Sequence, residues 1–425
     1  MLTIQDNSAI MSERPSIAPS HEHSLSVTLT TTFALIDQFS ASVARSTDQP
    51  IVPAEERLPS STPSPLALLS ASTASLKAQS TRLSLLTLTP PFTPPAVSKI
   101  LSALNSSVLP SLLTAALLIV NEDRKYTASF SAEVGSFVKA ILRDLHTLIS
   151  CVEERSRHAD PKEQLGEQQK HNVTEAVGRV WESCDGLVAL ADGGIGAFVV
   201  KKAEMWLGLI KDAVEELEEW DPEEDGVDGL FGEDALQNDH AGDEAEEVSA
   251  GPEITKASVM RVLTRVPQSL HVVVKQRLRK WRWGSPSSRD SFDGKTSETG
   301  GTSSDHDYQL LRDQHVTADH VLRGMQEVSE TVDEMAEALY MGQLIRSGKL
   351  VNDVWKATVD VVAAVRNSNE YHTTHGNGID VAEEQKETSE DKYIRRALDW
   401  IKLVEPKSPN SRAVTNGSQH QAKHS

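Results

Sequence analysis

Cysteine, aromatic residues and long apolar runs are scarce in this chain of 425 residues. Its two cysteines, Cys151 and Cys184, fit neither a disulfide framework nor a zinc site, which favours a reducing compartment. Aromatic residues make up only 5% of the chain, which argues against a β-sandwich or a β-barrel. The strongest apolar run, residues 108–120, is too short to span a membrane and contains Pro110. Because the opening residues also lack a signal-peptide pattern, we expect a soluble intracellular protein.

Positive charge is missing from one long segment and concentrated in the next. The formal net charge is −20, and no lysine or arginine lies between Lys211 and Lys256, whereas 18 acids fall from Asp212 to Glu253. Residues 254–283 then hold eight bases and no acid. Since a net anion is repelled by phosphates, we expect no direct binding of nucleic acid and no membrane binding. Because the two blocks are adjacent, we expect the acidic block from Asp212 to Glu253 to fold back over the basic block 254–283 and screen its charge.

Six stretches rich in proline, serine, glycine or like charges carry too little apolar surface to fold, so we expect them to be unstructured. They are residues 1–22, 47–64, 221–252, 284–304, 368–390 and 405–425. The predicted domains are a disordered N-terminus (1–22), an N-terminal helical-bundle domain (23–220), an acidic linker (221–252), a C-terminal helical domain (253–404) and a disordered tail (405–425). The C-terminal domain contains the disordered insert 284–304 and the loop 368–390.

Between these stretches the apolar residues recur every three or four positions, which is the spacing of one face of an α-helix. Four such stripes are Phe130, Val134, Phe137, Ile141, Leu145, Leu148 and Val152; Val173, Val177, Val180, Cys184, Leu187 and Ala191; Val199, Ala203, Trp206, Ile210, Ala213 and Leu217; and Val321, Met325, Val328, Val332, Met335 and Leu339. A repeat near 3.5 residues favours long helices packed almost side by side. We therefore predict an all-α protein, an antiparallel helical bundle with two helical lobes joined by an acidic disordered linker.

Shorter helices are expected around these four. They span residues 25–45, 66–89, 95–120, 254–283, 350–366 and 391–404. Pro94 and Pro95 should break the chain before the third of them, and Pro267 should kink or interrupt the fourth. Residues 317–319 should cap the helix that carries the last apolar stripe.

Three candidate sites for chemistry have the wrong spacing. The segment starting at Asp221 resembles a calcium loop, but Gly232 stands at position twelve, where a glutamate is required, so we predict a solvated acidic linker. The glycine-rich run 191–197 lacks phosphate-loop spacing, and we interpret it as a glycine hinge that ends one helix with a left-handed residue and lets backbones approach closely. His315 and His320 match no zinc motif. We expect no metal, no cofactor, no small-molecule substrate and no enzymatic activity.

The most site-like surface is a run of bases interleaved with tryptophans. Its members are Lys275, Arg277, Arg279, Lys280, Trp281, Arg282 and Trp283, called the basic cluster below. One interpretation is a partly buried helix end whose bases reach solvent. A second is a partner or nuclear-import patch, because bases steer anions and indoles supply rigid contact area. Direct nucleic-acid binding is the third, and the neighbouring acids oppose it.

Three segments resemble one known family. They are TRLSLLTLTPPFTPPAVSKILSAL (81–104), VWESCDGLVALADGGIGAFVVKKAEMWLGLIKDAVEELEEW (180–220) and TADHVLRGMQEVSETVDEMAEALY (317–340). This combination is similar to the cyclin-D-binding protein family, also called GCIP. With the intervening helices, the resemblance covers most of residues 66–404. The chain departs from the family in the serine-rich insert 284–304 and in the polar tail after Pro406.

The resemblance implies an all-helical, non-enzymatic protein that regulates the cell cycle and transcription. Its implied partners are cyclin-like or helix-loop-helix regulators, bound through faces of the helical bundle, and its implied location is both cytoplasm and nucleus. An alternative function is a vinculin-like cytoskeletal or junctional adaptor, since long bundles of this kind also occur in such proteins.

Overall fold

The computed structural model describes residues 21–48, 64–121, 125–157, 160, 162–220, 256–281, 283, 303–374 and 388–406. Every regular element in these ranges is a helix, which confirms the all-α prediction. The acidic linker 221–252 lies outside the described residues, as do most of the other five stretches predicted to be unstructured. The helices form two compact units.

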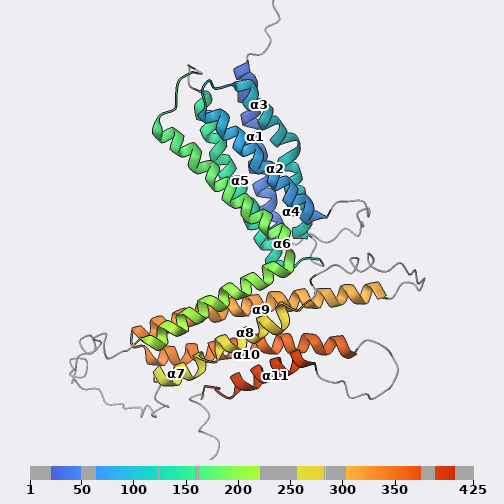
Figure 1. Ribbon diagram of the computed structural model, residues 1–425, viewed down its shortest axis with the longest axis vertical. Helices are drawn as coiled ribbons and strands as arrows, with labels where there is room; N and C mark the ends of the chain where they lie inside the picture. Colours follow the sequence, from blue (N-terminus) through green and yellow to red (C-terminus); the bar gives the residue numbers. More distant parts are fainter. Residues whose placement is uncertain are drawn as a thin grey trace, which may run out of the picture. The chain divides into compact units, whose positions relative to one another are not determined.

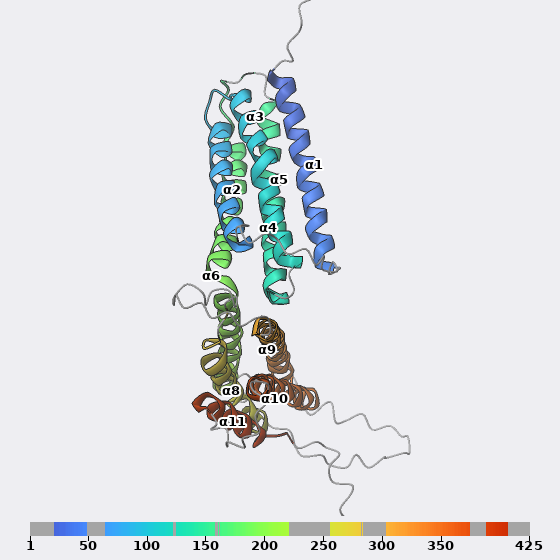
Figure 2. The ribbon, with the colours of Figure 1, turned by 90° about the vertical axis from the view of Figure 1, so that its right-hand side faces the viewer.

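The first unit consists of Met1–Glu122 and Ser131–Asp192. Its elements are α1 (His21–Asp48), α2 (Pro65–Leu88), α3 (Pro94–Ala103), the π-helical turn η1 (Leu104–Val108), α4 (Leu109–Asn121), most of α5 (Ala128–Ser156) and the first half of α6 (Glu167–Glu219). Helix α2 packs on α4, and α1 packs on α3 (Figure 1, Figure 2). Trp181 Nε1 on α6 donates a hydrogen bond to Thr81 Oγ1 on α2 at 3.0 Å, which attaches α6 to this bundle.

The second unit consists of Asp123–Phe130 and Gly193–Ser425. Its elements are the second half of α6, then α7 (Lys256–Leu263), α8 (Val266–Val273), the π-helical turn η4 (Val274–Leu278), α9 (Ser303–Tyr340), α10 (Leu344–Thr374) and α11 (Ser389–Lys402). Helices α9 and α10 form a long hairpin, and α7, α8 and α11 pack on α10 (Figure 1). Arg265 joins α11 to the break between α7 and α8, because it donates to Trp400 O at 2.8 Å and lies over the Trp400 ring.

The division between the units falls inside α6, between Asp192 and Gly193. This differs from the predicted N-terminal domain 23–220, because the helix continues on both sides of the division and no linker composition marks it. Gly194 has φ 66° and ψ −172°, so α6 is kinked there. The left-handed φ confirms the predicted helix break in the glycine run 191–197.

The predicted apolar stripes are largely the buried faces. All six residues of the stripe in 173–191 are buried, and so are all six in 321–339. Three predicted positions are only half-buried: Phe137 in the first stripe, and Trp206 and Ala213 in the stripe from 199 to 217, where the neighbours Leu207 and Val214 are buried instead. The buried face of this half of α6 therefore consists of Val199, Ala203, Leu207, Ile210, Val214 and Leu217.

The proline predictions are confirmed. Pro94 begins α3, and Pro267 lies in the first turn of α8, after a break that ends α7 at Leu263. Proline is tolerated in the first turn because its missing N–H has no partner to lose there.

Two predicted helix boundaries are wrong. Residues 317–319 do not cap α9, which begins at Ser303, because the buried stripe extends back to Leu311. Asp319 caps α5 instead: its carboxylate accepts hydrogen bonds from Ala128 N at 2.7 Å and Ser129 N at 2.9 Å.

The loop 368–390 is shorter than predicted, since α10 runs to Thr374 and α11 begins at Ser389. A helix that is already packed extends readily, because each further residue adds one hydrogen bond.

Two helical stretches are long and apolar enough to cross a membrane: Pro94–Asn121 and Glu167–Glu219. The first exceeds the run 108–120 because α3, η1 and α4 follow one another without a break. The core helix of a soluble protein passes the same test. The most apolar window is 39% buried in the first stretch and 33% buried in the second.

Candidate functional site

The basic cluster lies at the end of α8 and just beyond it. Lys275 and Arg277 belong to η4, a wider turn that is frequent at functional sites, and the other described members follow it. Arg282 lies outside the described residues. The apolar face of α8 anchors this end of the chain, because Leu270 and Val273 are fully buried.

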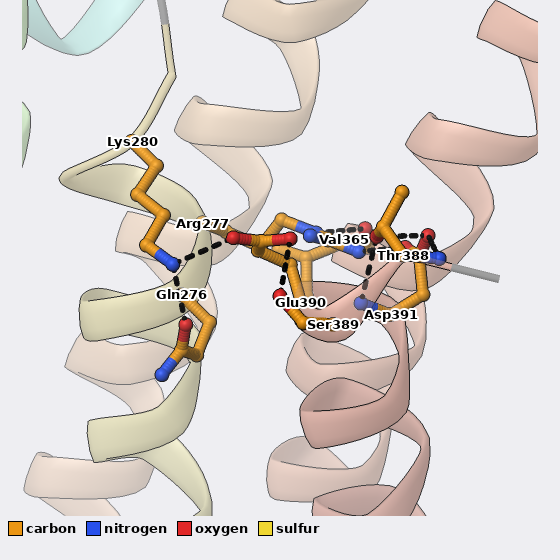
Figure 3. A network of polar contacts seen from close by, with 8 residues as sticks. All are labelled: Gln276, Arg277, Lys280, Val365, Thr388, Ser389, Glu390 and Asp391. Carbon is orange, nitrogen blue, oxygen red and sulfur yellow. Dashed lines mark hydrogen bonds and ion pairs between the residues drawn. The ribbon is translucent and has the colours of Figure 1, made fainter.

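Arg277 is buried, with 6% of its side chain exposed. Its Nη2 atom forms an ion pair with Asp391 Oδ1, and its Nε atom donates to Val365 O at 3.4 Å (Figure 3). One guanidinium therefore connects η4 to α10 and to the first turn of α11. A buried cation is tolerable only when it is paired and hydrogen-bonded in this way.

Asp391 is held in place by the N-terminal cap of α11. Thr388 is the capping residue: its Oγ1 accepts a hydrogen bond from Asp391 N at 3.2 Å, while Asp391 Oδ2 accepts one from Thr388 N at 3.3 Å. This reciprocal arrangement is a capping box, with aspartate in the position usually held by glutamate. The Asp391 carboxylate therefore serves both the helix start and Arg277.

Lys280 binds the neighbouring acid of the same helix start. Its Nζ atom donates to Glu390 Oε1 and to Gln276 Oε1, both at 2.8 Å (Figure 3). The hydrogen bond from Lys280, together with those from the Glu390 backbone and Ser389, lowers the pKa of Glu390 to about 2. Glu390 is therefore ionised at neutral pH.

Arg279 points to α6, where its Nε atom donates to Glu204 Oε1 at 2.9 Å. Both side chains remain well exposed. Nearby on α8, the pKa of His271 is lowered, mainly by partial burial and then by the charges of Lys211, Lys275 and Arg279. The charge of Glu204 opposes this shift.

The two tryptophans are packing residues. Trp283 Nε1 donates to Leu278 O at 3.1 Å, and the Trp281 and Trp283 rings meet edge to face, with centroids 5.5 Å apart. Trp283 also lies against Gly196 of α6, where a Cβ atom would be 2.6 Å from Trp283 Cγ. Glycine therefore permits this contact, as the hinge interpretation of residues 191–197 predicts.

Three bases of the basic cluster thus have acidic partners within the chain, and one of the three is buried. This geometry fits the interpretation of a partly buried helix end, whereas the partner or nuclear-import role stays a prediction. The sequence did not reveal the acids Glu204, Glu390 and Asp391 as partners. One signal was present: the capping-box pattern of Thr388 and Asp391 could have placed Glu390 and Asp391 at the start of a helix.

His315 on α9 is a buried histidine next to this cluster. Its ring stacks on that of Trp283, with centroids 6.4 Å apart and planes 11° apart, and neither ring nitrogen has a hydrogen-bond partner among the described residues. Burial lowers the pKa of His315, and the charge of Asp319 opposes this shift. The neutral imidazole is therefore the form that fits the folded chain.

We expect the second unit to lose stability on acidification because of His315. The folded pKa is lowered, so below about pH 6.5 the unfolded chain binds the proton more readily, and stability falls with a slope of at most about 1.4 kcal/mol per pH unit. Urea midpoints of the chain and of His315→Gln, measured between pH 7.5 and 5.5, test this. The variant should show the shallower dependence, and equal slopes would contradict the assignment.

The described residues contain no group of three or more His, Cys, Asp or Glu side chains that could hold a metal ion. Burial raises the pKa of the Cys184 thiol to about 12, and burial together with Glu154 raises that of Cys151, so neither thiol is activated as a nucleophile.

Comparison with known protein families gives a match to the family described as Grap2 and cyclin-D-interacting, N-terminal, over residues 68–223. This confirms the resemblance over that region. Comparisons with curated proteins and with solved structures give no match. The matched region contains most of α2, then α3 to α5 and the whole of α6, so it extends beyond the first unit across the kink at Gly194.

Proposed function

We propose that this chain, whose residues 68–223 match the family described as Grap2 and cyclin-D-interacting, N-terminal, is a non-enzymatic regulator of the cell cycle and transcription. It binds cyclin-like or helix-loop-helix partners through helix faces of the bundle and works in the cytoplasm and the nucleus. The family match is the observation that carries this proposal. The all-helical architecture supports it, because helical partners dock onto faces and grooves between helices.

The absence of enzymatic activity is part of the same proposal. The protonated thiols and the pairing of the basic cluster with acids support it, because both leave those side chains engaged in structure. The alternative of a vinculin-like adaptor predicts actin-linked partners instead of cyclins or transcription regulators.

Two exposed aliphatic side chains of similar exposure allow a matched test of the surface that binds the partner. Leu85 on α2 lies inside the family domain and is 57% exposed, while Val27 on α1 lies outside it and is 54% exposed. We expect Leu85→Asp to reduce binding of a purified D-type cyclin at least about fivefold, since a charge on an interface typically costs 1 kcal/mol or more. Val27→Asp should bind like the unchanged chain.

The measurement is a titration of each full-length variant with the cyclin, followed by circular dichroism to verify that helix content is unchanged. Weaker binding by Val27→Asp together with unchanged binding by Leu85→Asp would place the contact outside the matched region. Affinity capture that recovers actin-linked proteins in place of cyclins and helix-loop-helix regulators would favour the adaptor function.

A further inference from the structure

The turn between α9 and α10 exposes the densest apolar group in the part of the chain that the structure describes. Met341 is 58% exposed, Leu344 is 45% exposed and Ile345 is 76% exposed, so three of the ten exposed large apolar side chains lie within five residues. We call these three residues the turn patch. A cluster of exposed apolar side chains is a surface on which another segment or molecule can dock favourably.

The turn that carries the patch is well ordered by hydrogen bonds. Gly342 has φ 67°, its N–H donates to Leu339 O at 3.0 Å, and Gln343 N donates to Ala338 O at 2.8 Å. These two bonds define a Schellman motif, which ends α9. The patch is therefore presented by a fixed backbone rather than by a frayed helix end.

Both ends of the acidic segment 221–255 are fixed next to this turn. Trp220 packs its ring edge to face on Tyr340, with centroids 4.9 Å apart, and Tyr340 directly precedes the patch. Lys256 lies over the Trp220 ring at 5.6 Å, donates to Trp220 O and donates to Glu218 O at 3.2 Å. The end of α6, the start of α7 and the end of α9 thus meet at one end of the second unit (Figure 1).

The composition of the segment matches the turn patch. Four of its large apolar residues, Val227, Leu230, Phe231 and Leu236, fall within residues 227–236, and acids surround them. Two exposed bases, Arg346 and Lys349, follow the patch on α10. Arg346 also lies 3.8 Å from Glu334, an exposed pair that water weakens.

We infer that residues 227–236 of the acidic segment dock on the turn patch, with Leu230 and Phe231 covering Met341, Leu344 and Ile345. The length of the chain allows this, because Phe231 is eleven residues from Trp220 and eleven extended residues span up to about 35–40 Å. The acids of the segment then lie near Arg346 and Lys349. A partner that binds the turn patch must then first displace residues 227–236, and a partner that binds residues 227–236 must first detach them from the patch.

Disulfide trapping tests the inference with a matched control. Gln343→Cys in the turn is combined either with Glu233→Cys, thirteen residues after Trp220, or with Asp243→Cys, thirteen residues before Lys256. Both combinations remove one carboxylate, and both keep Leu230 and Phe231. The background is the full-length chain with Cys151 and Cys184 changed to alanine.

We expect the Glu233 pair to form its intramolecular disulfide at least about tenfold faster than the Asp243 pair in a glutathione buffer. Adding Leu230→Ser and Phe231→Ser should reduce its rate to that of the control. Equal rates for the two pairs would overturn the inference. A predominantly intermolecular disulfide at low protein concentration would also overturn it, in favour of a second copy on the patch.

Hydrogen exchange of the chain with its natural cysteines provides an independent measurement. Amides of residues 341–346 should exchange more slowly in the unchanged chain than in Leu230→Ser/Phe231→Ser. Identical exchange in the two chains would rule out docking even if the cysteine variants fold poorly.

Discussion

Asp391→Asn is expected to lower the free energy of unfolding of the second unit by about 2–4 kcal/mol, since it leaves the buried Arg277 guanidinium without its carboxylate. An asparagine at this position keeps a side-chain oxygen that can accept the hydrogen bond from Thr388 N, so α11 should still begin at the same residue. The loss of stability should therefore come from the missing negative charge. Because Arg277 also joins η4 to Val365 on α10, contacts of α11 and α10 should loosen together.

Denaturant unfolding followed by tryptophan fluorescence measures this effect, and hydrogen exchange assigns it to a unit. The matched control is Glu390→Gln, one residue earlier on the same helix, which breaks the exposed ion pair with Lys280. This pair is more open to solvent than the pair of Arg277 with Asp391, so the control should lose clearly less stability than Asp391→Asn. Equal losses of stability for Asp391→Asn and Glu390→Gln would contradict the prediction, because they would show that the burial of Arg277 does not make its ion pair more important.

Gly196→Ala is the second substitution with a large expected effect. The new Cβ atom would lie 2.6 Å from Trp283 Cγ and 3.0 Å from Trp283 Cβ, so the tryptophan must move as a whole instead of turning its ring tip. Overpacking of this kind costs about 1–3 kcal/mol. We expect a lower denaturant midpoint and a shift in the emission of Trp283.

A double-mutant cycle separates this clash from the helix propensity of alanine. In a Trp283→Ala background the clash is absent, so Gly196→Ala should become neutral or slightly stabilising, because alanine favours helix. The same loss in both backgrounds would place the cost in the α6 backbone. Gly208→Ala on the same helix is the matched control, because its Cβ atom would meet nothing within 4 Å.

The helices could be predicted from the sequence because their apolar residues repeat at helical spacing over many turns. The stripes that end at Ala191 and Leu339 are buried throughout, and the kink at Gly194 falls in the run that the sequence marked as a helix break. Where the stripe was misplaced, at Trp206 and Ala213, the next residue along is buried instead, and the residues that contact this half of α6, such as Trp283 and Tyr340, are distant in the sequence. Periodicity alone does not contain that information.

The candidate site was harder to predict for a similar reason. The sequence singled out the bases around Arg277 but not the acids that bind them, since Glu204 and Asp391 are 75 and 114 residues away from their partners. A run of lysines and arginines looks the same whether it faces a partner or its own chain. Only the fold shows that the central arginine is buried.

The position of the division within α6 determines which fragments of the chain can be stable alone. A fragment ending at residue 223, where the family match ends, would keep the second half of α6 without α7 to α11. Its stripe containing Val199, Ala203 and Ile210 would then face water, and exposed apolar stripes of this length cause self-association. Fragments that are meant to stay monomeric are better ended at the glycine run than at the acidic segment.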